Sequence, residues 1–244
     1  MAGRVHNLYP LLMVIGPWRE ALFLKRPNRF LAAVEQEGER VWAHVPDPGR
    51  LRELLVPGAR VRVMPAASKG RRTAWDLFGV ACPQGWVNID SRLPNLLFAE
   101  AVRGAELEEF PNITHLDPEY RFGNSVLDFL LHGGDRPCLV EVKGCTLAVD
   151  RLALFPDAPT ARGSRHLEEL VKARREGFRA CAVFVVKHPA AVAFTANRET
   201  DPVFASTLER AYEQGVEIIA YLAPWRGREI RLASRLPFLS LPRS

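Results

Sequence analysis

Three charged residues interrupt two otherwise apolar segments of this sequence. Asp128 lies within residues 126–131, and Glu141 and Lys143 lie within residues 138–143. Both segments have the composition of buried strands, whose side chains alternate between two faces. An ionised carboxylate in such a strand is costly unless a partner or a metal ion compensates its charge. These residues are therefore the first candidates for a chemical site.

The spacing of these residues predicts a metal site. Alternation places Asp128 on one face with Val126 and Leu130, opposite to Leu127, Phe129 and Leu131, and it places Lys143 on the face of Glu141. A Gly-Gly-Asp turn at residues 133–135 joins the strands, so the acids meet if they face the same way. Oxygen ligands with no nearby Cys or His pair favour Mg²⁺ or Mn²⁺ over Zn²⁺.

Lys143 could orient a water molecule or neutralise the charge that develops on a phosphate. The alternative is a buried salt bridge between Lys143 and Glu141 or Asp128, which performs no chemistry.

The segments around these strands predict an α/β sheet. A helix after Asp90 and Ser91 ends at Gly104, and strands follow over 119–122, 126–132 and 138–142. A helix capped by Ser164 ends at Gly177, and a second one, capped by Asp201, ends at Gly215. Apolar strands over 181–186 and 216–222 complete a sheet covered by helices.

The first third of the chain has a different pattern. Short strands are expected over 21–25, 30–37, 40–45, 60–64, 74–81 and 86–89, with one short helix over 50–55. This pattern fits a small barrel of the oligonucleotide-binding (OB) type. Residues 1–85 hold 13 Lys and Arg against 7 Asp and Glu, a net charge of +6. Since the whole chain has a net charge of +5, the barrel contains the entire excess, as expected of a module that meets a polyanion. A basic solvated surface is the alternative.

Composition excludes several classes of protein. With 48% hydrophobic and 25% charged residues, the chain of 244 residues is neither disordered nor fibrous. The apolar stretch Leu8 to Gly16 is too short to span a bilayer and makes a poor secretory signal, which predicts a cytoplasmic protein with no membrane partner. The four cysteines are far apart and are expected to be reduced.

Motifs along nearly the whole chain, from about residue 18 to 225, resemble one family in order. The Asp128 and Glu141-Val142-Lys143 pattern resembles the PD-(D/E)XK nuclease core, and the wider set resembles the sugar fermentation stimulation protein A family. The matching segments are 29–32, 43–46, 49–51, 94–95, 100–101, 128–131, 140–143, 155–158, 162–163 and 166–167.

This resemblance implies an α/β chain (α+β overall) of two domains. Residues 1–88 would form an OB-like barrel, and residues 89–244 a PD-(D/E)XK nuclease-like mixed sheet flanked by helices. It also implies DNA binding and an association with regulating sugar-utilisation genes.

The resemblance further assigns roles to individual residues. It places Asp128 and Glu141 on metal-ligand positions and Lys143 on the catalytic lysine position, with the Val142 carbonyl as a further ligand. Glu100 matches an accessory acid, with a solvated helix glutamate as the alternative.

Four positions depart from the patterns that this resemblance implies. Leu127 stands where the wider nuclease superfamily often has Pro, Val126 stands where the family often has Arg, and Asp47-Pro48 replaces the Asn-Thr that is common in some members. None of these departures removes a ligand, but the missing Arg weakens phosphate clamping beside Asp128.

A second cluster follows the Glu-Val-Lys strand. Asp157, Thr160 and His166 are accessory candidates, and Arg162 with the helix start near Gly163 could hold a phosphate. The alternatives are turn and capping roles, and for His166 a surface position on the helix.

The barrel supplies candidate contacts to nucleic acid. The expected phosphate contacts are Arg50, Arg52, Arg60, Arg62, Lys69, Arg71 and Arg72. Trp42, Trp75 and Phe78 are possible stacking platforms, whereas His44 and Asp47 fit a turn.

The sequence thus predicts a protein that binds DNA with little sequence preference and contains an Mg²⁺- or Mn²⁺-dependent phosphodiesterase centre. A non-enzymatic DNA-binding regulator with a structural or vestigial acid cluster is the alternative, and RNA is a further candidate partner.

Overall fold

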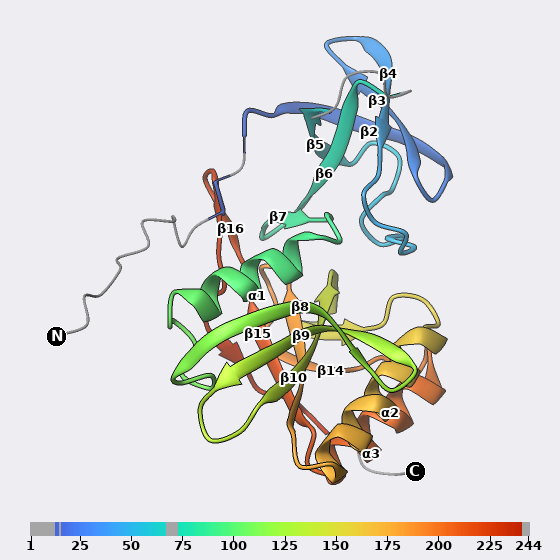
Figure 1. Ribbon diagram of the computed structural model, residues 1–244. Helices are drawn as coiled ribbons and strands as arrows, with labels where there is room; N and C mark the ends of the chain where they lie inside the picture. The colour runs from blue at the N-terminus through green and yellow to red at the C-terminus, as the bar shows by residue number, and fades with distance from the viewer. Residues whose placement is uncertain (1–12, 15, 67–72, 241–244) are drawn as a thin grey trace, which may run out of the picture.

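A closed barrel forms the first part of the computed structural model, which describes residues 13–14, 16–66 and 73–240. Its strands are β2 (Arg19–Asn28), β3 (Leu31–Gln36), β4 (Glu39–His44), β5 (Arg60–Pro65), β6 (Trp75–Cys82) and β7 (Gly85–Asn88). They pair in the order β4-β3-β2-β5-β6-β7, and a parallel pairing of β4 with β6 closes five of them into a barrel (Figure 1). This topology confirms the predicted OB-type fold.

The helix predicted over residues 50–55 is wrong, because these residues form a turn. Leu51 has φ +48°, which a right-handed helix does not allow. The Arg26 guanidinium fixes the loop before it by donating to the carbonyl oxygens of Asp47 (2.7 Å) and Gly49 (2.8 Å).

A mixed six-stranded sheet forms the second part. The strands β8 (Ile113–Phe122), β9 (Ser125–Gly133), β10 (Cys138–Cys145), β13 (Arg179–Val186), β15 (Glu217–Leu222) and β18 (Arg235–Leu236) lie in the order β18-β15-β13-β10-β9-β8. β10, β13 and β15 are parallel, whereas β8, β9 and β18 are antiparallel to their neighbours. The predicted strand over 119–122 is the last part of the longer β8.

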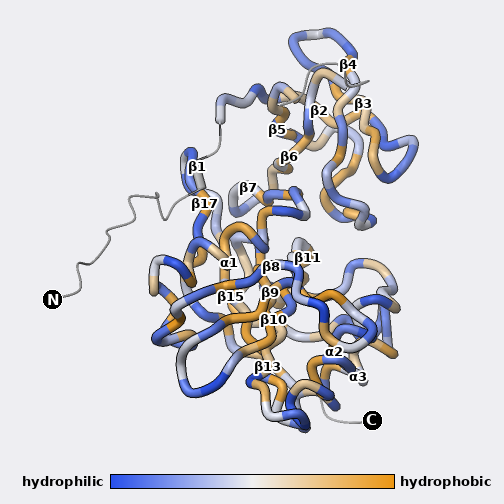
Figure 2. The backbone as a smooth tube through the Cα atoms, viewed as in Figure 1, coloured by the Kyte–Doolittle hydropathy of each residue, from blue (hydrophilic) through white to orange (hydrophobic). Residues whose placement is uncertain are grey.

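Helices cover both faces of this sheet, as predicted. α1 (Leu93–Arg103) packs on one face through Phe98, which contacts Phe129 of β9 and Phe110. α2 (Ala161–Arg175) and α3 (Pro202–Glu213) pack on the other face, where Leu170 and Phe204 are buried with Phe184 of β13. The inner strands β13 and β15 are accordingly rich in apolar residues (Figure 2).

The three helices begin differently from one another. α3 begins after Asp201, as predicted, because Asp201 Oδ1 accepts the Phe204 N–H at 2.9 Å. α2 begins earlier than predicted, because Thr160 and not Ser164 is its N-cap and accepts the Gly163 N–H at 3.1 Å. α1 begins after Arg92 with no side-chain cap, although it ends before Gly104 as predicted.

Replacing Asp201 by Ala is expected to lower the free energy of unfolding by about 2 kcal/mol. Besides capping α3, Asp201 Oδ2 accepts the Thr160 N–H at 2.7 Å, so one carboxylate stabilises the starts of two helices. Urea denaturation measures the change. Asp135→Ala, in an exposed turn, is the matched control, and an equal effect of the two substitutions would contradict this role.

Shorter elements connect the two parts. β11 (Leu147–Val149), β12 (Leu152–Phe155) and β14 (Ala193–Ala196) form a small sheet, and β1 (Met13–Val14), β16 (Trp225–Arg226) and β17 (Glu229–Ile230) form another. The β16–β17 hairpin reaches the barrel, where the Trp225 ring fits against Gly79 of β6. A Cβ atom on Gly79 would lie 2.4 Å from that ring, so glycine is required there.

No helix in the described part of the chain has the length and apolarity that crossing a membrane requires.

Candidate active site between the sheet and the barrel

Asp128 lies where the β9–β10 ladder ends. The two strands pair up to Val140 and Phe129. Beyond this pair, Asp128 Oδ2 accepts the Val142 N–H at 2.7 Å, so a side chain takes the place of a backbone acceptor. Asp128 Oδ1 accepts the Asn95 amide N–H at 2.8 Å from α1. Strand geometry therefore brings Asp128 beside Glu141, as the sequence predicts.

The predicted alternation along β9 holds only on one side of Asp128. Phe129 and Leu131 are buried on the α1 side of the sheet, but Leu127 is buried on the α2–α3 side with Leu130. Across the ladder, Glu119 of β8 has φ +53°, so the pairing is irregular at this level. The sequence pattern could not show a local change of direction in the strand.

Glu141 is the most deeply buried acid of the site, with 3% of its surface exposed. Its Oε1 accepts hydrogen bonds from Lys143 Nζ and from His166 Nδ1. Arg162 Nε donates to His166 Nε2 at 3.3 Å, so the imidazole donates from Nδ1 and accepts at Nε2. Glu141 Oε2 is buried and has no hydrogen-bond partner in the described part of the chain.

His166 is therefore a residue of the site and not the surface helix histidine that the sequence left as the alternative. It is 4% exposed and lies on the inner face of α2. The position of His166 at helical spacing from Arg162 was the available signal, but the sequence could not show which face of α2 meets the sheet.

A cavity of about 470 Å³ opens beside these residues, between the sheet and the barrel. The second predicted cluster lines it too, since Asp157, Thr160 and Arg162 come from the loop after β12 and the start of α2. The predicted site residues that line this cavity are Asp128, Glu141, Val142, Lys143, Asp157, Thr160 and Arg162.

A loop of the barrel forms the opposite wall of the cavity. Asp47 and Gly49 line it, and Asp157 Oδ2 accepts the Leu51 N–H at 3.2 Å across the two parts of the chain. Gly49 allows this approach, because a Cβ atom there would lie 2.8 Å from both Asp47 Oδ1 and Asp157 Oδ2. Asp47, which the sequence assigned to a turn, thus also lines the cavity.

The two central acids have opposite pKa shifts. Burial raises the pKa of Asp128, and the neighbouring Glu141 carboxylate raises it further. Burial would raise the pKa of Glu141 as well, but the hydrogen bond from His166 and the Lys143 ammonium together hold it below its ordinary value. Glu141 is therefore held in its carboxylate form, whereas the environment of Asp128 disfavours its charge.

The donor set fits a hard divalent cation. Two carboxylates share one wall of the cavity, and the unpartnered buried oxygen Glu141 Oε2 needs a ligand. Oxygen donors of this kind suit Mg²⁺ or Mn²⁺. Among the described residues, no group of three His, Cys, Asp or Glu side chains forms a ready-made cage, so a bound ion would need water or substrate oxygens as well.

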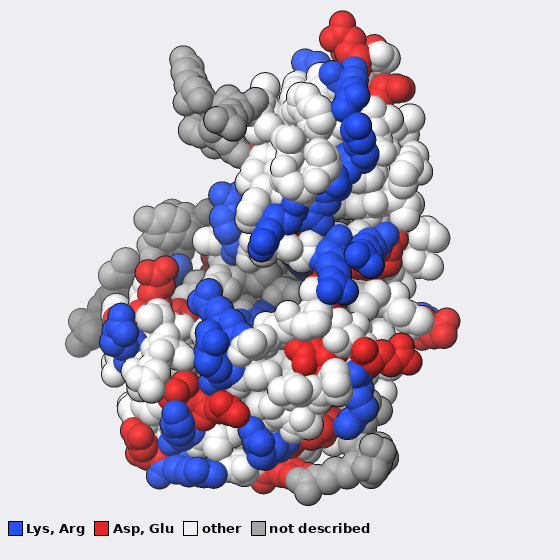
Figure 3. Space-filling model, turned by 90° about the vertical axis from the view of Figure 1, so that its right-hand side faces the viewer, with Lys and Arg blue, Asp and Glu red and all other residues white. Residues whose placement is uncertain are grey.

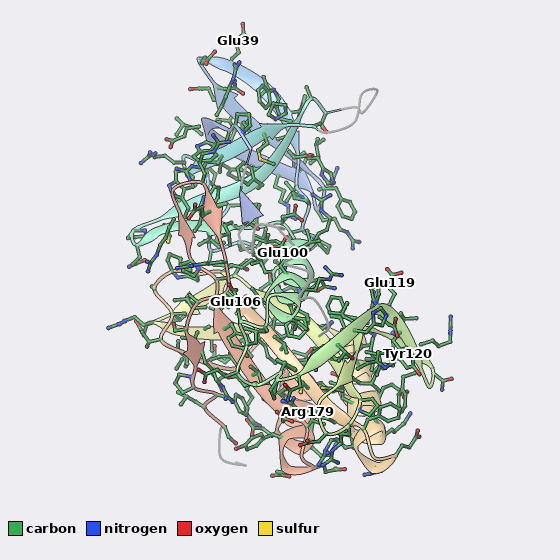
Figure 4. All side chains as sticks on the ribbon, turned by 60° about the vertical axis from the view of Figure 1, so that its left-hand side comes forward. Glu39, Glu100, Glu106, Glu119, Tyr120 and Arg179 are labelled. Carbon is green, nitrogen blue, oxygen red and sulfur yellow. The ribbon has the colours of Figure 1, made fainter. Side chains whose placement is uncertain are left out.

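Glu100 does not belong to this group. It lies on α1 (Figure 4) but not among the residues that line the cavity. Asn95, five residues earlier and about 140° away around the helix, is the α1 residue that contacts Asp128. Burial raises the pKa of Glu100, with Arg103 as the nearby charge. The sequence selected an acid on this helix, whereas the structure presents an amide.

The predicted phosphate contacts of the barrel differ in their surroundings. Arg50 and Arg52 are exposed in the loop beside the cavity, and Arg60 is exposed and paired with Glu20 at 2.7 Å. Lysine and arginine side chains follow a line down the barrel toward the junction with the second part (Figure 3). Lys69, Arg71 and Arg72 lie outside the described residues.

The burial of Arg62 contradicts its predicted role as a phosphate contact. Its side chain is 12% exposed. The guanidinium carbon lies 3.8 Å from the ring centre of Trp86, 4.4 Å from that of Trp18 and 4.6 Å from that of Trp225. Arg62 is thus enclosed by three indoles where the hairpin meets the barrel.

The predicted stacking platforms differ in exposure. Phe78 is 2% exposed and belongs to the core, so its prediction is wrong. Trp42 is 40% exposed with Arg40 over its ring, and Trp75 is half-buried with Arg19 over its ring. Trp42 is therefore the most exposed of the three predicted platforms and the best candidate for stacking on bases.

Comparisons with known proteins agree with this division into two parts. The family model described as the SfsA N-terminal OB domain matches residues 24–89, and that described as the sugar fermentation stimulation protein RE domain matches residues 92–229.

Two curated relatives are sugar fermentation stimulation protein homologs. The one from Moorella thermoacetica is 50% identical over 204 residues, which are 83% of this chain and 88% of the relative. The one from Methanothermobacter thermautotrophicus is 45% identical over 210 residues, which are 86% and 87% of the two chains.

A solved structure has the same fold. The structure of Pyrococcus furiosus SfsA in complex with Ca²⁺ is similar with a TM-score of 0.87 at 32% identity, covering 93% of this chain and 98% of that chain.

Proposed function

Because this chain belongs to the sugar fermentation stimulation protein (SfsA) family, we propose that it is a DNA-binding protein with a divalent-metal-dependent phosphodiesterase centre. Residues 1–88 bind the nucleic acid, and residues 89–244 provide the chemistry. The observation that supports this proposal best is the position of Asp128 and the buried Glu141 in the lining of one cavity, where Glu141 Oε2 has no hydrogen-bond partner among the described residues.

The residues of the cavity have distinct roles in this proposal. Asp128 and Glu141 would hold Mg²⁺ or Mn²⁺, with the Val142 carbonyl as a further ligand. The ion would supply Lewis-acid polarisation of the phosphodiester. Lys143 is half-buried beside Glu141 and would orient the attacking water or neutralise charge on the phosphate. His166 orients Glu141, and Arg162 in turn holds His166.

The Ca²⁺ in the structure of the Pyrococcus furiosus relative supports a divalent ion in this family. The carboxylate donors of the present cavity are of the type that binds such ions.

Calorimetric titration of Mn²⁺ into the free protein tests the metal site. The parent is expected to bind Mn²⁺, and Glu141→Gln is expected to weaken binding at least about tenfold, because one charged oxygen ligand is lost. The matched control is Glu169→Gln, a buried acid of α2 that pairs with Lys172 and does not line the cavity. No heat of binding in the parent would favour the non-enzymatic DNA-binding regulator, in which the acid cluster is structural.

Binding to DNA is expected to weaken steeply with added salt. Each phosphate contact contributes about −0.9 to the log–log slope on duplex DNA and about −0.7 on single strands. Arg50→Ala and Arg52→Ala should each make the slope shallower by about one contact, because both guanidinium groups are exposed beside the cavity. Fluorescence anisotropy at several salt concentrations measures the slope.

The control for this measurement is Arg175→Ala. Arg175 is an exposed residue in the last turn of α2 and does not belong to the barrel. A flat salt response in the parent would argue against the barrel as the binding surface. RNA oligonucleotides used as competitors separate a preference for DNA from a preference for RNA.

A further inference from the structure

Lys187 is a buried lysine at the junction of the barrel and the sheet. It directly follows β13, and its side chain is 1% exposed. It nevertheless lines the same cavity as Asp128, Glu141 and Lys143. A lysine this deeply buried is uncommon, because removing an ammonium from water is costly without a compensating charge.

The Lys187 ammonium has few partners. Nζ donates to the Asp90 carbonyl oxygen at 3.2 Å, which is its one hydrogen bond within the described part of the chain. No described carboxylate lies within the 4.0 Å of a salt bridge to it. An ammonium has three N–H donors, so two remain for an acceptor in the cavity.

More distant acids oppose the effect of burial on this ammonium without occupying its donors. Burial lowers the pKa of Lys187, whereas Asp47, Asp90 and, more weakly, Asp157 act to raise it. Asp47 and Asp157 are engaged elsewhere, since Asp47 accepts the Gly49 N–H at 2.7 Å and Asp157 accepts the Leu51 N–H. They offset part of the cost of burial and leave the N–H groups of Lys187 available.

A glycine allows the ammonium to lie close to the strand that carries Glu141 and Lys143. Gly144 follows Lys143 and also lines the cavity. A Cβ atom there would lie 3.4 Å from Lys187 Nζ and 2.9 Å from Pro94 Cγ. The missing side chain therefore lets Lys187 pack directly against β10 beside the cavity.

We propose that Lys187 is an anion-binding residue of the cavity, which donates hydrogen bonds to a non-bridging oxygen of a bound phosphodiester. This role rests on the proposed function. It adds a phosphate-binding residue to the site formed by Asp128, Glu141 and Lys143. A phosphate oxygen is the acceptor that suits a buried and under-bonded ammonium, because its negative charge offsets the free-energy cost of burying a positive charge.

Two substitutions test this role. Lys187→Met removes the charge and keeps the length, and Lys187→Gln also keeps a donor for the Asp90 carbonyl if the apolar variant folds poorly. Lys172→Met, which removes one charge far from the cavity, is the matched control. The rise of the thermal unfolding midpoint with inorganic phosphate is measured in EDTA at constant ionic strength, so that no divalent ion contributes.

The parent is expected to gain stability from phosphate, and both Lys187 variants are expected to lose most of that gain. Their affinity for a fluorescent single-stranded oligonucleotide should fall about tenfold or more, as expected for a lost charged hydrogen bond. Without phosphate, Lys187→Met should unfold no earlier than the parent, because an under-compensated buried charge is gone.

The outcomes separate this inference from the proposed function. A phosphate response that is absent from the parent, or equal in the parent and both variants, overturns the role of Lys187 even if the parent binds DNA. A phosphate response that disappears in the variants supports that role even if the parent neither binds nor cleaves DNA, in which case the proposed function fails alone. If both variants have a lower thermal unfolding midpoint and an unchanged phosphate response, Lys187 only stabilises the fold, which also overturns the role.

Discussion

Asp128→Asn is expected to abolish Mn²⁺-dependent cleavage of DNA, with a loss of at least about 100-fold, while the protein stays folded. The reason is the environment of this carboxylate. Its pKa is raised by burial and by Glu141, so the charge is destabilising in the free protein and is retained at the expense of stability. Removing the charge should change the free energy of unfolding little, because relief of the buried charge offsets the loss of one of the two hydrogen-bond acceptors, whereas activity is lost.

Lys143→Met distinguishes chemistry from metal binding in the same experiment. It should reduce cleavage about 100-fold or more while Mn²⁺ still binds, because both carboxylates remain and His166 still donates to Glu141. Products from single- and double-stranded DNA are measured on gels, metal binding by calorimetry and folding by urea denaturation, with Lys172→Met as the control. Equal products from the parent and both variants would remove the enzymatic proposal and leave a DNA-binding protein.

Arg62→Ala should lower the free energy of unfolding by about 3 kcal/mol. The substitution removes three cation–π contacts, with Trp18, Trp86 and Trp225, and leaves a void where the hairpin meets the barrel. Tryptophan fluorescence during urea denaturation reports directly on this cluster. Once the variant is folded, its affinity for DNA should be close to that of the parent, because the guanidinium is not at the surface.

Arg60→Ala is the matched control for Arg62, since it lies two residues earlier on β5 with its side chain 63% exposed. An exposed ion pair of this kind contributes at most about 1 kcal/mol. The reverse pattern, a stable Arg62 variant with much weaker DNA binding, would restore the surface role that the sequence suggested.

Local chemistry determined much of this protein from the sequence alone. Asp128, Glu141 and Lys143 stood out because charges inside apolar strands need a reason, and alternation predicted that Glu141 and Lys143 share a face. The start of α3 followed from Asp201 and Pro202, because N-capping depends only on neighbouring residues. The division into a basic barrel and an apolar, helix-covered sheet also followed from composition and period.

Contacts between distant segments were decided only by the tertiary structure. Arg62 had the sequence of a phosphate contact, but three tryptophans from residues 18, 86 and 225 enclose it. Asn95 and not Glu100 contacts Asp128, because the docking of α1 selects which side of the helix meets the sheet. Lys187 gave no local signal, since its burial depends on Asp90, Gly144 and the barrel loop at Asp47. Alternation and capping act over a few residues, whereas burial and pairing depend on how separate elements pack together.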